Sequence, residues 1–241
     1  MAHIEVEKLC KTINKSIVLE DINLDMSSGK VYGFQGINGS GKTMLMRALI
    51  GLIRPTSGKV CIDGKELGKD IDFPESIGFL LENPAFLDMY SGEDNLKLLA
   101  KVDGNVDKKS VENEIRGLID DVGLGQAGRK KYKKYSLGMK QRLGIAAAVL
   151  GNPDIVVLDE PTNALDDDGK EMVKSVVRKQ KERGALVIIS CHDMQTLEEL
   201  SDEIVKLKEG RICGSRTRSA GCEELRDRQA KHLEGEAAIK H

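Results

Sequence analysis

The sequence predicts an α/β fold with a mainly parallel central sheet, an N-terminal antiparallel β-subdomain and a helical insertion. Three short apolar runs, IGFLL (77–81), DIVVLD (154–159) and ALVIIS (185–190), are typical of strands buried on both faces of a parallel sheet. Helix-like segments separate these runs, and such alternation favours parallel pairing of the strands. Segments of the first third instead alternate apolar and polar residues, which indicates a sheet with one solvated face.

The N-terminal antiparallel sheet is predicted by the segments IEVEKL, SIVLEDINLDM and KVCIDGKEL. In these segments apolar and polar residues alternate over much of their length, which is typical of strands with one buried face. Asp63 and Gly64 form a hairpin turn signal inside the third segment. We therefore expect these strands to pair antiparallel beside the parallel core.

The helical insertion is predicted from Ser91 to about Tyr135, within a helical subdomain at about 87–150. SGEDNLKLLAKV opens with a capping box of Ser91 and Asp94, and VENEIRGLIDDVGL carries apolar residues three and four positions apart. Residues 216–241 form a short polar C-terminal extension with a helical pattern in EELRDRQAKHLEG. We expect the whole chain, residues 1–241, to form a single domain.

Composition excludes several classes of function. The 241 residues carry a net charge of -2, and 32% of them are charged with both signs interspersed, so no basic field recruits nucleic acid. The longest apolar runs are far too short to span a bilayer, and the N-terminus does not resemble a signal peptide. We therefore expect a cytoplasmic protein that reaches a membrane only through a partner.

The cysteines give no sign of a metal site or of a disulfide framework. They form no CxxC pair and no zinc-like spacing, which indicates reduced thiols in the cytosol. We expect most of them to be small buried hydrophobic residues. They are Cys10, Cys61, Cys191, Cys213 and Cys222.

The strongest chemical signal is GINGSGKT, which follows the apolar strand VYGFQ and precedes the helical MLMRALIGLI. This strand–loop–helix context is the one that a phosphate-binding P-loop requires, and it disfavours an ordinary Gly/Ser-rich turn. Its glycines let the backbone N–H groups point at an anion near a helix N-terminus. Lys42 would reach the β- and γ-phosphates, and Thr43 would bind Mg²⁺. The predicted phosphate-binding residues are Gly36, Asn38, Gly39, Ser40, Gly41, Lys42, Thr43 and Met44.

A second chemical signal is DIVVLDEPT, in which an apolar strand delivers Asp159 to its carboxyl end. An α/β sheet places its ligands at that end. The Asp159 carboxylate can hold Mg²⁺ there, and Glu160 is suited to orient or deprotonate an attacking water. A strand that ends in acidic turn residues is common in isolation, but beside a P-loop the magnesium interpretation is favoured.

These two signals and three further segments resemble the ATP-binding subunit of ABC-type ATPases, over roughly residues 1 to 215. GINGSGKT resembles the Walker A motif and IVVLDE resembles Walker B. YSLGMKQR resembles the signature motif usually written LSGGQ, NALD (163–166) the D-loop, and SCHD (190–193) the switch segment with its histidine. The order and the spacing of these segments agree with the family pattern, as do their residue types. The resemblance implies a P-loop NTPase fold and an ATPase that uses ATP and Mg²⁺.

The resemblance also gives YSLGMKQR a role. In the family, two such domains pack head to tail, and the signature of each lies across the ATP held by the other's P-loop. Ser136 would then supply a hydroxyl, Gly138 would allow close backbone approach, and the helix N-terminus would face the γ-phosphate. A helix capped by Ser136 is the simpler interpretation, and the two are compatible because capping and phosphate binding use the same donors.

Three further features keep two interpretations each. His192 would bond the γ-phosphate as a neutral imidazole, although a lone histidine is usually structural, and the family match favours the phosphate contact. Asp166 would contact the opposite subunit or cap the helix that begins with DDGKEMVKSVV. RKKYKKY (129–135) is a nucleic-acid patch or a solvated basic loop, and the balanced charge elsewhere favours the loop.

The chain departs from the family pattern at several positions. Ile13 stands where an aromatic residue commonly stacks on adenine, so we expect poor discrimination between bases. Glu82 stands at the Q-loop glutamine; it keeps an oxygen for Mg²⁺ or for the attacking water, whereas the simpler interpretation is a solvated turn acid. Leu137 and Met139 replace signature residues, and Met44 removes a P-loop hydroxyl. We expect binding and hydrolysis to survive with altered affinity.

The function that follows is ATP hydrolysis that drives a membrane permease: ATP closes a dimer of these domains, hydrolysis reopens it, and the region around Glu82 transmits the motion. Glu82 together with YSLGMKQR resembles subunits of bacterial exporters for antimicrobial peptides and drugs. The alternative is a soluble ABC-type ATPase that serves an assembly process without a permease.

The expected cofactors are ATP and Mg²⁺. The expected partners are a transmembrane permease subunit and a second ATP-binding domain, at the cytoplasmic face of the membrane. The predicted catalytic residues are Glu160, His192, Lys42 and Glu82, and the predicted metal ligands are Thr43, Asp159 and Glu82.

Overall fold

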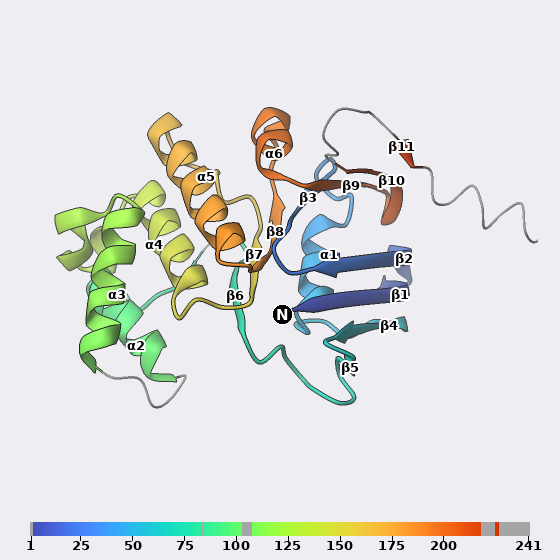
Figure 1. Cartoon of the computed structure of the whole chain (residues 1–241), viewed down its shortest axis with the longest axis horizontal. Helices are drawn as coiled ribbons and strands as arrows, with labels where there is room; N and C mark the ends of the chain where they lie inside the picture. Colours follow the sequence, from blue (N-terminus) through green and yellow to red (C-terminus); the bar gives the residue numbers. More distant parts are fainter. Residues whose placement is uncertain (1, 83, 103–107, 218–224, 227–241) are drawn as a thin grey trace, which may run out of the picture.

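The computed structural model describes residues 2–82, 84–102, 108–217 and 225–226. A seven-stranded mixed sheet, in the order β11-β10-β9-β3-β8-β7-β6, lies beside a four-stranded antiparallel sheet, in the order β2-β1-β4-β5 (Figure 1). The strands are β1 (His3–Ile13), β2 (Ser16–Ser27), β3 (Val31–Gln35), β4 (Ser57–Ile62), β5 (Lys65–Glu66), β6 (Ile77–Leu80), β7 (Ile155–Leu158), β8 (Leu186–Ser190), β9 (Glu203–Lys208), β10 (Arg211–Thr217) and β11 (Leu225–Arg226). The helices are α1 (Lys42–Leu49), α2 (Gly92–Val102), α3 (Lys108–Asp121), α4 (Leu137–Val149), α5 (Asp167–Glu182) and α6 (Met194–Leu200), with the 3-10 turns η1 (Gly125–Arg129) and η2 (Tyr132–Lys134).

The five strands β9-β3-β8-β7-β6 of the large sheet are parallel to one another, and β10 pairs antiparallel with β9. Every residue of β7 and β8 is buried, which confirms the prediction for these two apolar runs. For IGFLL the prediction of burial on both faces is wrong. The reason is that β6 is the edge strand, where Leu80 is buried but Phe79 is exposed.

The antiparallel sheet forms where the alternating segments predict it. Strand β1 pairs antiparallel with β2 and with β4, and Ile62 pairs with Lys65 across the hairpin that joins β4 to β5. Asp63 and Gly64 adopt φ angles of 51° and 79°, as a two-residue hairpin of the primed type requires. The turn signal read from these two residues is therefore confirmed.

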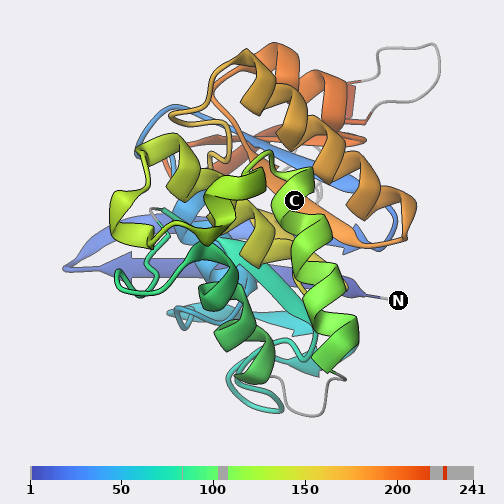
Figure 2. The ribbon, with the colours of Figure 1, turned by 90° about the vertical axis from the view of Figure 1, so that its left-hand side faces the viewer.

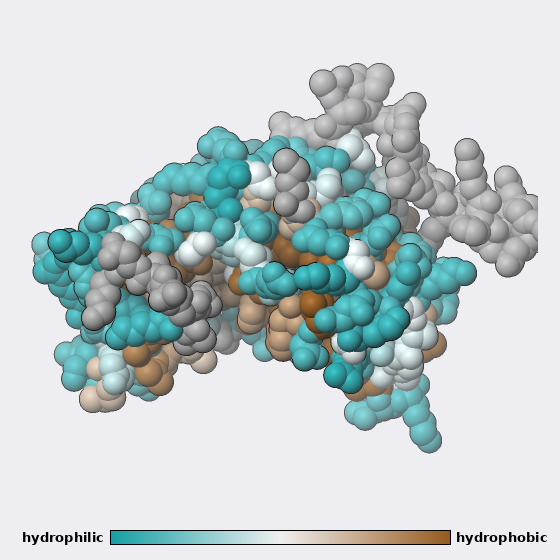
Figure 3. Space-filling model, turned by 60° about the horizontal axis from the view of Figure 1, so that its bottom comes forward, coloured by the Kyte–Doolittle hydropathy of each residue, from teal (hydrophilic) through white to brown (hydrophobic). Residues whose placement is uncertain are grey.

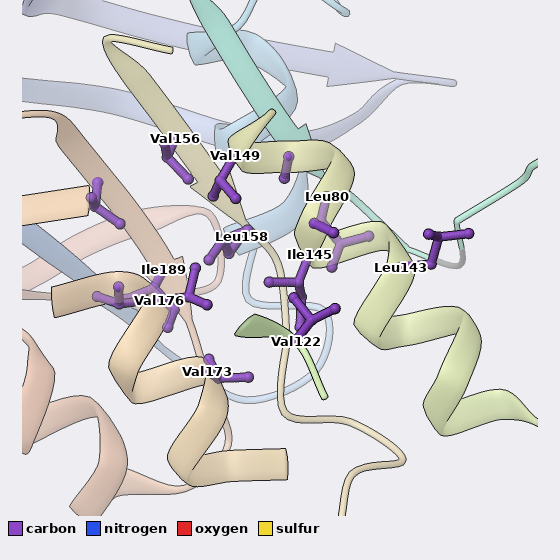
Figure 4. Packing of buried hydrophobic residues seen from close by; sticks show 14 of the residues in the cluster. Leu80, Val122, Leu143, Ile145, Val149, Val156, Leu158, Val173, Val176 and Ile189 are labelled. Atoms are coloured by element: carbon purple, nitrogen blue, oxygen red, sulfur yellow. The ribbon is translucent and has the colours of Figure 1, made fainter. Parts of the chain in front are cut away.

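The two faces of the large sheet bury different side chains, because successive residues of a strand point to opposite sides. Val156 and Leu158 of β7 pack with α4 and α5 in a cluster that we call the helical-side cluster (Figure 4). Ile155 and Val157 pack instead with α1 and the antiparallel sheet, in the α1-side cluster. Helices α1 and α4 thus lie on opposite faces of the large sheet.

The segment from α2 to α4 is helical, as its periodicity predicts, and Figure 2 shows these helices in front of the sheets. Ser91 begins α2: its Oγ accepts a hydrogen bond from the Asp94 N–H at 3.1 Å and donates one to Asp94 Oδ2 at 2.6 Å. For residues 129–135 the prediction of a solvated basic loop is wrong for the two tyrosines. Tyr132 and Tyr135 are buried in the helical-side cluster, and only the basic side chains around them are exposed.

Two smaller expectations need correction. The four cysteines that the structure describes are free thiols, but only Cys191 is buried; the others lie on strands whose side chains partly face solvent, and Cys222 lies outside the described residues. Leu225 and Arg226 pair with β10 as a strand instead of continuing a helix, and the rest of the predicted C-terminal helix lies outside the described residues. None of the helices in the described ranges has the length and apolar character that a membrane span needs.

Candidate nucleotide-binding site

The candidate site forms where the carboxyl ends of three neighbouring parallel strands meet. Strand β3 leads into the P-loop, β7 ends just before Asp159, and β8 ends at Ser190, two residues before His192. Because β3 pairs with β8 and β8 pairs with β7, these ends lie along one edge of the sheet. The topology therefore brings together residues that are more than a hundred positions apart.

The P-loop has a shape that only glycine permits at several positions. Gly39 and Gly41 adopt φ angles of 79° and 105°, in the left-handed region that side chains disfavour. A Cβ on Gly36 would lie 2.3 Å from Ser40 Oγ and 2.6 Å from the Leu207 carbonyl oxygen. These glycines are needed by the fold of the loop itself.

Two polar groups of the P-loop, the Lys42 ammonium and the Ser40 hydroxyl, are buried. Lys42 Nζ donates hydrogen bonds to the carbonyl oxygens of Gly36 at 2.7 Å and Ile37 at 3.3 Å, so the loop itself binds the ammonium group. Ser40 is only 2% exposed, and its hydroxyl has no hydrogen-bond partner among the described residues. An unpaired buried hydroxyl costs about 1–3 kcal/mol, which a phosphate oxygen would recover. Asn38 is exposed, and Met44 packs against the α1-side cluster.

Thr43 and Asp159 are in direct contact. Thr43 Oγ1 donates to Asp159 Oδ2 at 2.5 Å, and Ser190 Oγ donates to Asp159 Oδ1 at 2.5 Å. A hydroxyl and a carboxylate are oxygen donors of the kind that Mg²⁺ prefers. The pair therefore fits the metal role predicted for these two residues.

Ser190 is a site residue that the sequence analysis did not single out. Besides its bond to Asp159, its Oγ accepts a hydrogen bond from the Glu160 N–H at 2.9 Å, and the side chain is fully buried. One hydroxyl thus fixes both acidic residues. The signal that could have revealed it is its place at the end of an apolar strand, which resembles the place of Asp159 after the neighbouring strand.

Glu160 and His192 face each other. Glu160 Oε2 accepts a hydrogen bond from the His192 backbone N–H at 3.1 Å, and His192 Nε2 lies 3.3 Å from Glu160 Oε1. Burial raises the pKa of the Glu160 carboxyl above its ordinary value, while His192 and Lys42 partly oppose the rise. A carboxylate that is more basic than usual is better suited to accept a proton from water.

The signature segment lies away from the P-loop of its own chain. Ser136 caps α4, since its Oγ accepts from the Met139 N–H at 3.3 Å, and α4 and α1 lie on opposite faces of the large sheet. A Cβ on Gly138 would lie 3.0 Å from the Ala164 carbonyl oxygen in the D-loop. Ser136 is exposed at this helix start, where the first backbone N–H groups have no partner within the helix itself.

Two side chains attach the signature helix to the Walker B and D-loop segments. Gln141 Nε2, which the sequence analysis did not consider, donates to the carbonyl oxygens of Glu160 at 3.3 Å and Pro161 at 3.2 Å. Arg142 donates to Asp166 Oδ1 at 3.1 Å. Asp166 also accepts from the Gly169 N–H at 2.9 Å, so the helix-cap interpretation of this residue is confirmed.

Glu82 forms no hydrogen bond with Thr43 or Asp159 in the described part of the chain. Its Oε1 instead accepts from Arg47 Nη2 on α1, at 2.5 Å. The structure therefore brings Thr43 and Asp159 together, and it places Glu82 in an ion pair with Arg47 instead.

The β1–β2 hairpin lies against the P-loop. The Ser40 carbonyl accepts a hydrogen bond from the Gly210 N–H. The Gly210 carbonyl in turn accepts one from the Glu20 N–H of β2. At the tip of the same hairpin, Ile13 and Ile17 are exposed. The tip of the hairpin thus carries aliphatic side chains at these two positions.

Comparison with known proteins agrees with this arrangement. The model of a family described as "ABC transporter" matches residues 19–163. The chain is 45% identical over 209 residues to "Uncharacterized ABC transporter ATP-binding protein YybJ" of Bacillus subtilis (strain 168), covering 87% of this chain and 94% of the relative. It is 38% identical over 233 residues to "Bacitracin transport ATP-binding protein BcrA" of Enterococcus faecalis, covering 96% and 73%. A solved "Structure of ATP binding subunit of ABC transporter" superposes with a TM-score of 0.80 at 26% identity, covering 96% and 93%.

Proposed function

The chain belongs to the ABC transporter family as an ATP-binding, ATP-hydrolysing subunit, and we propose that it powers a bacterial-type exporter permease from the cytoplasmic face of a membrane. The observation that carries the proposal is the hydrogen-bonded chain from Thr43 through Asp159 and Ser190 to Glu160. It joins a phosphate loop, a metal-binding pair and a basic carboxylate in one network. Export of a peptide antibiotic is supported by the bacitracin transport relative.

The site fits a magnesium-bound triphosphate. Thr43 Oγ1 and Asp159 Oδ2 would hold Mg²⁺, which when bound neutralises phosphate oxygens. Lys42 would exchange the Gly36 and Ile37 carbonyls for the β- and γ-phosphates, and Ser40 Oγ would pair with a phosphate oxygen. The fit rests on a cation and a hydroxyl that are already buried in the loop.

The hydrolytic step would then use the residues at the ends of β7 and β8. The Glu160 carboxylate orients the attacking water and takes its proton. The His192 backbone N–H holds this carboxylate, and the imidazole lies where it can reach the γ-phosphate. Ser190 keeps Asp159 and Glu160 in place through its two hydrogen bonds.

We further propose that residues 1–241 act as one domain that pairs head to tail with a second copy or a related domain. Ser136 and Gly138 would complete the partner's site, because the helix that Ser136 caps and the helix that follows the P-loop lie on opposite faces of the large sheet. The N-terminus of α4 offers unpaired N–H groups and a positive dipole end to a γ-phosphate.

A permease can dock on the exposed apolar side chains between β6 and α2. We call these residues the docking surface: Phe79, Leu87, Met89, Tyr90 and Leu99. They flank Glu82 and the start of the helical region, and apolar patches stand out against a mainly hydrophilic surface in Figure 3. Large apolar side chains exposed to solvent favour an interaction site in this part of the chain.

Membrane association tests the permease proposal. Expressed alone, the chain should remain in the supernatant, but with its permease it should sediment with membranes and resist a salt wash, since apolar contacts are little affected by screening. The proteins that co-purify after detergent solubilisation identify the permease. The double variant Leu87→Glu, Met89→Glu should leave the membranes, whereas the exposed control Glu171→Gln should stay. Native protein found wholly in the supernatant with a scaffold protein would favour the assembly ATPase.

Nucleotide choice tests the aliphatic base site. ATP and GTP should bind with affinities within about a hundredfold, about 2.7 kcal/mol, because triphosphate and metal contacts dominate where no aromatic ring stacks on the base. Displacement of a fluorescent ATP analogue measures both. Ile13→Tyr should tighten both purine nucleotides, with Ile13→Ala as the control. A larger preference for ATP would mean that another residue recognises adenine.

A further inference from the structure

Glu82 is held in one place by its backbone and by its partner. Its φ angle is 60°, in the left-handed region that residues with a side chain disfavour. Its carboxylate pairs with Arg47 at 2.5 Å, and the two side chains are 65% and 31% exposed. Arg47 is thus the more buried residue of the ion pair, and it anchors the side chain of Glu82 at this turn.

Arg47, the partner of Glu82, lies one helical turn after Thr43. Arg47 follows Thr43 by four positions in α1, so the two side chains share a face of the helix, with a rise of about 5.4 Å between them. Glu82 comes two residues after Leu80, whose carbonyl accepts a hydrogen bond from the Asp159 N–H at 2.8 Å. The turn that carries Glu82 is thus tied to Asp159 through β6, and its partner Arg47 is tied to Thr43 through α1.

Charge gives a reason for the pairing. Asp159 and Glu160 already place two carboxylates at this edge of the sheet, and Lys42 is the cation that lies among them. A third carboxylate, where the family usually has an amide, would repel both of them and an incoming triphosphate. Arg47 neutralises the charge of this third carboxylate as long as no metal ion is bound.

We propose that Arg47 is a positioning residue that holds the Glu82 carboxylate away from the Thr43–Asp159 pair, and that Glu82 leaves Arg47 for the metal when Mg²⁺ and nucleotide bind. Arg47 is thereby a competitor of the metal for the same carboxylate. The inference rests on the proposed ATP and Mg²⁺ site, and it adds to that site a residue that sets its metal dependence.

The test is the Mg²⁺ dependence of nucleotide binding, measured by fluorescence titration without turnover. Arg47→Met keeps the length of the side chain but frees Glu82. ATP in EDTA should then bind about two- to fivefold more weakly, the range expected for a partly exposed pair. The Mg²⁺ concentration at half-maximal effect should fall by a similar factor. Arg47→Lys should restore both values, because it keeps the charge.

A double-mutant cycle separates this role from a structural one. In the Glu82→Gln background, Arg47→Met should change neither value, because no carboxylate remains to be held. The control Lys65→Met removes a cation from another exposed pair, with Glu75, and should have no effect. Equal effects of Arg47→Met in both backgrounds, with unchanged thermal unfolding, would overturn the proposal. If the unmodified chain binds ATP with no response to Mg²⁺, the proposed metal site fails instead and takes this inference with it.

Discussion

Glu160→Gln should lower ATP turnover by roughly a hundredfold or more while ATP binding persists. The glutamine amide keeps the size of the side chain, and its oxygen can still accept a hydrogen bond from the His192 backbone N–H. It cannot, however, accept a proton from water. Burial raises the pKa of the Glu160 carboxyl, so the natural residue is a better base than an exposed glutamate. Phosphate release measures turnover, and equilibrium titration with ATP measures binding.

The matched control is Glu171→Gln, which removes an exposed carboxylate on α5. This variant should hydrolyse ATP at the normal rate. If Glu160→Gln also retains near-normal turnover, Glu160 is not the base and another group must orient the water. If it loses binding as well as turnover, its role is in holding the nucleotide and not in the chemical step.

The parts of the site that the sequence predicts are those encoded by adjacent residues. The glycines of the P-loop, the acidic pair after β7 and the cap at Ser136 each depend on a local backbone geometry, and local geometry follows from a few neighbouring residues. The apolar runs of β7 and β8 predict their burial for the same reason. These features could be predicted without knowledge of the tertiary structure.

The parts that the sequence does not predict depend on which strands become neighbours. Ser190 joins Asp159 because β8 pairs with β7, and Arg47 reaches Glu82 across 35 positions of sequence. Tyr132 lies in a run of basic residues, yet it is buried and donates to the Pro84 carbonyl at 2.6 Å. Composition describes the basic side chains correctly and misses the tyrosine, because burial is decided by the segment against which the turn packs.

Mixing two inactive variants should restore ATPase activity if the signature serves a partner. Lys42→Ala removes the phosphate-binding cation, and Ser136→Arg places a bulky charge at the exposed helix start. Each variant alone should be nearly inactive, because every shared site in its homodimer lacks one part. In a mixed dimer, one site carries both defects, and the other pairs an intact Lys42 with an intact Ser136.

The recovered activity should depend on how the chains are mixed. At equal amounts, half of the dimers are mixed and one of their two sites is intact, so recovery should reach at most about a quarter of the normal activity. It should rise with protein concentration, because closure of the dimer is bimolecular. A mixture of Lys42→Ala with unmutated chain at the same ratio gives the reference for independent sites.

Cross-linking decides the outcome if mixed dimers form and remain inactive. In the Glu160→Gln background, which should trap ATP between the chains, Ser136→Cys on one chain and Asn38→Cys on the other should form a disulfide across the interface, because Asn38 is exposed in the P-loop. Chains without Ser136→Cys control for the exposed native Cys213. A cross-link with inactive mixtures would mean that both sites must fire together, so that one intact site is not enough. Dimers without the cross-link would show that Ser136 acts within its own subunit. Because α4 and α1 lie on opposite faces of the large sheet, that result would require the helical region to move relative to the P-loop.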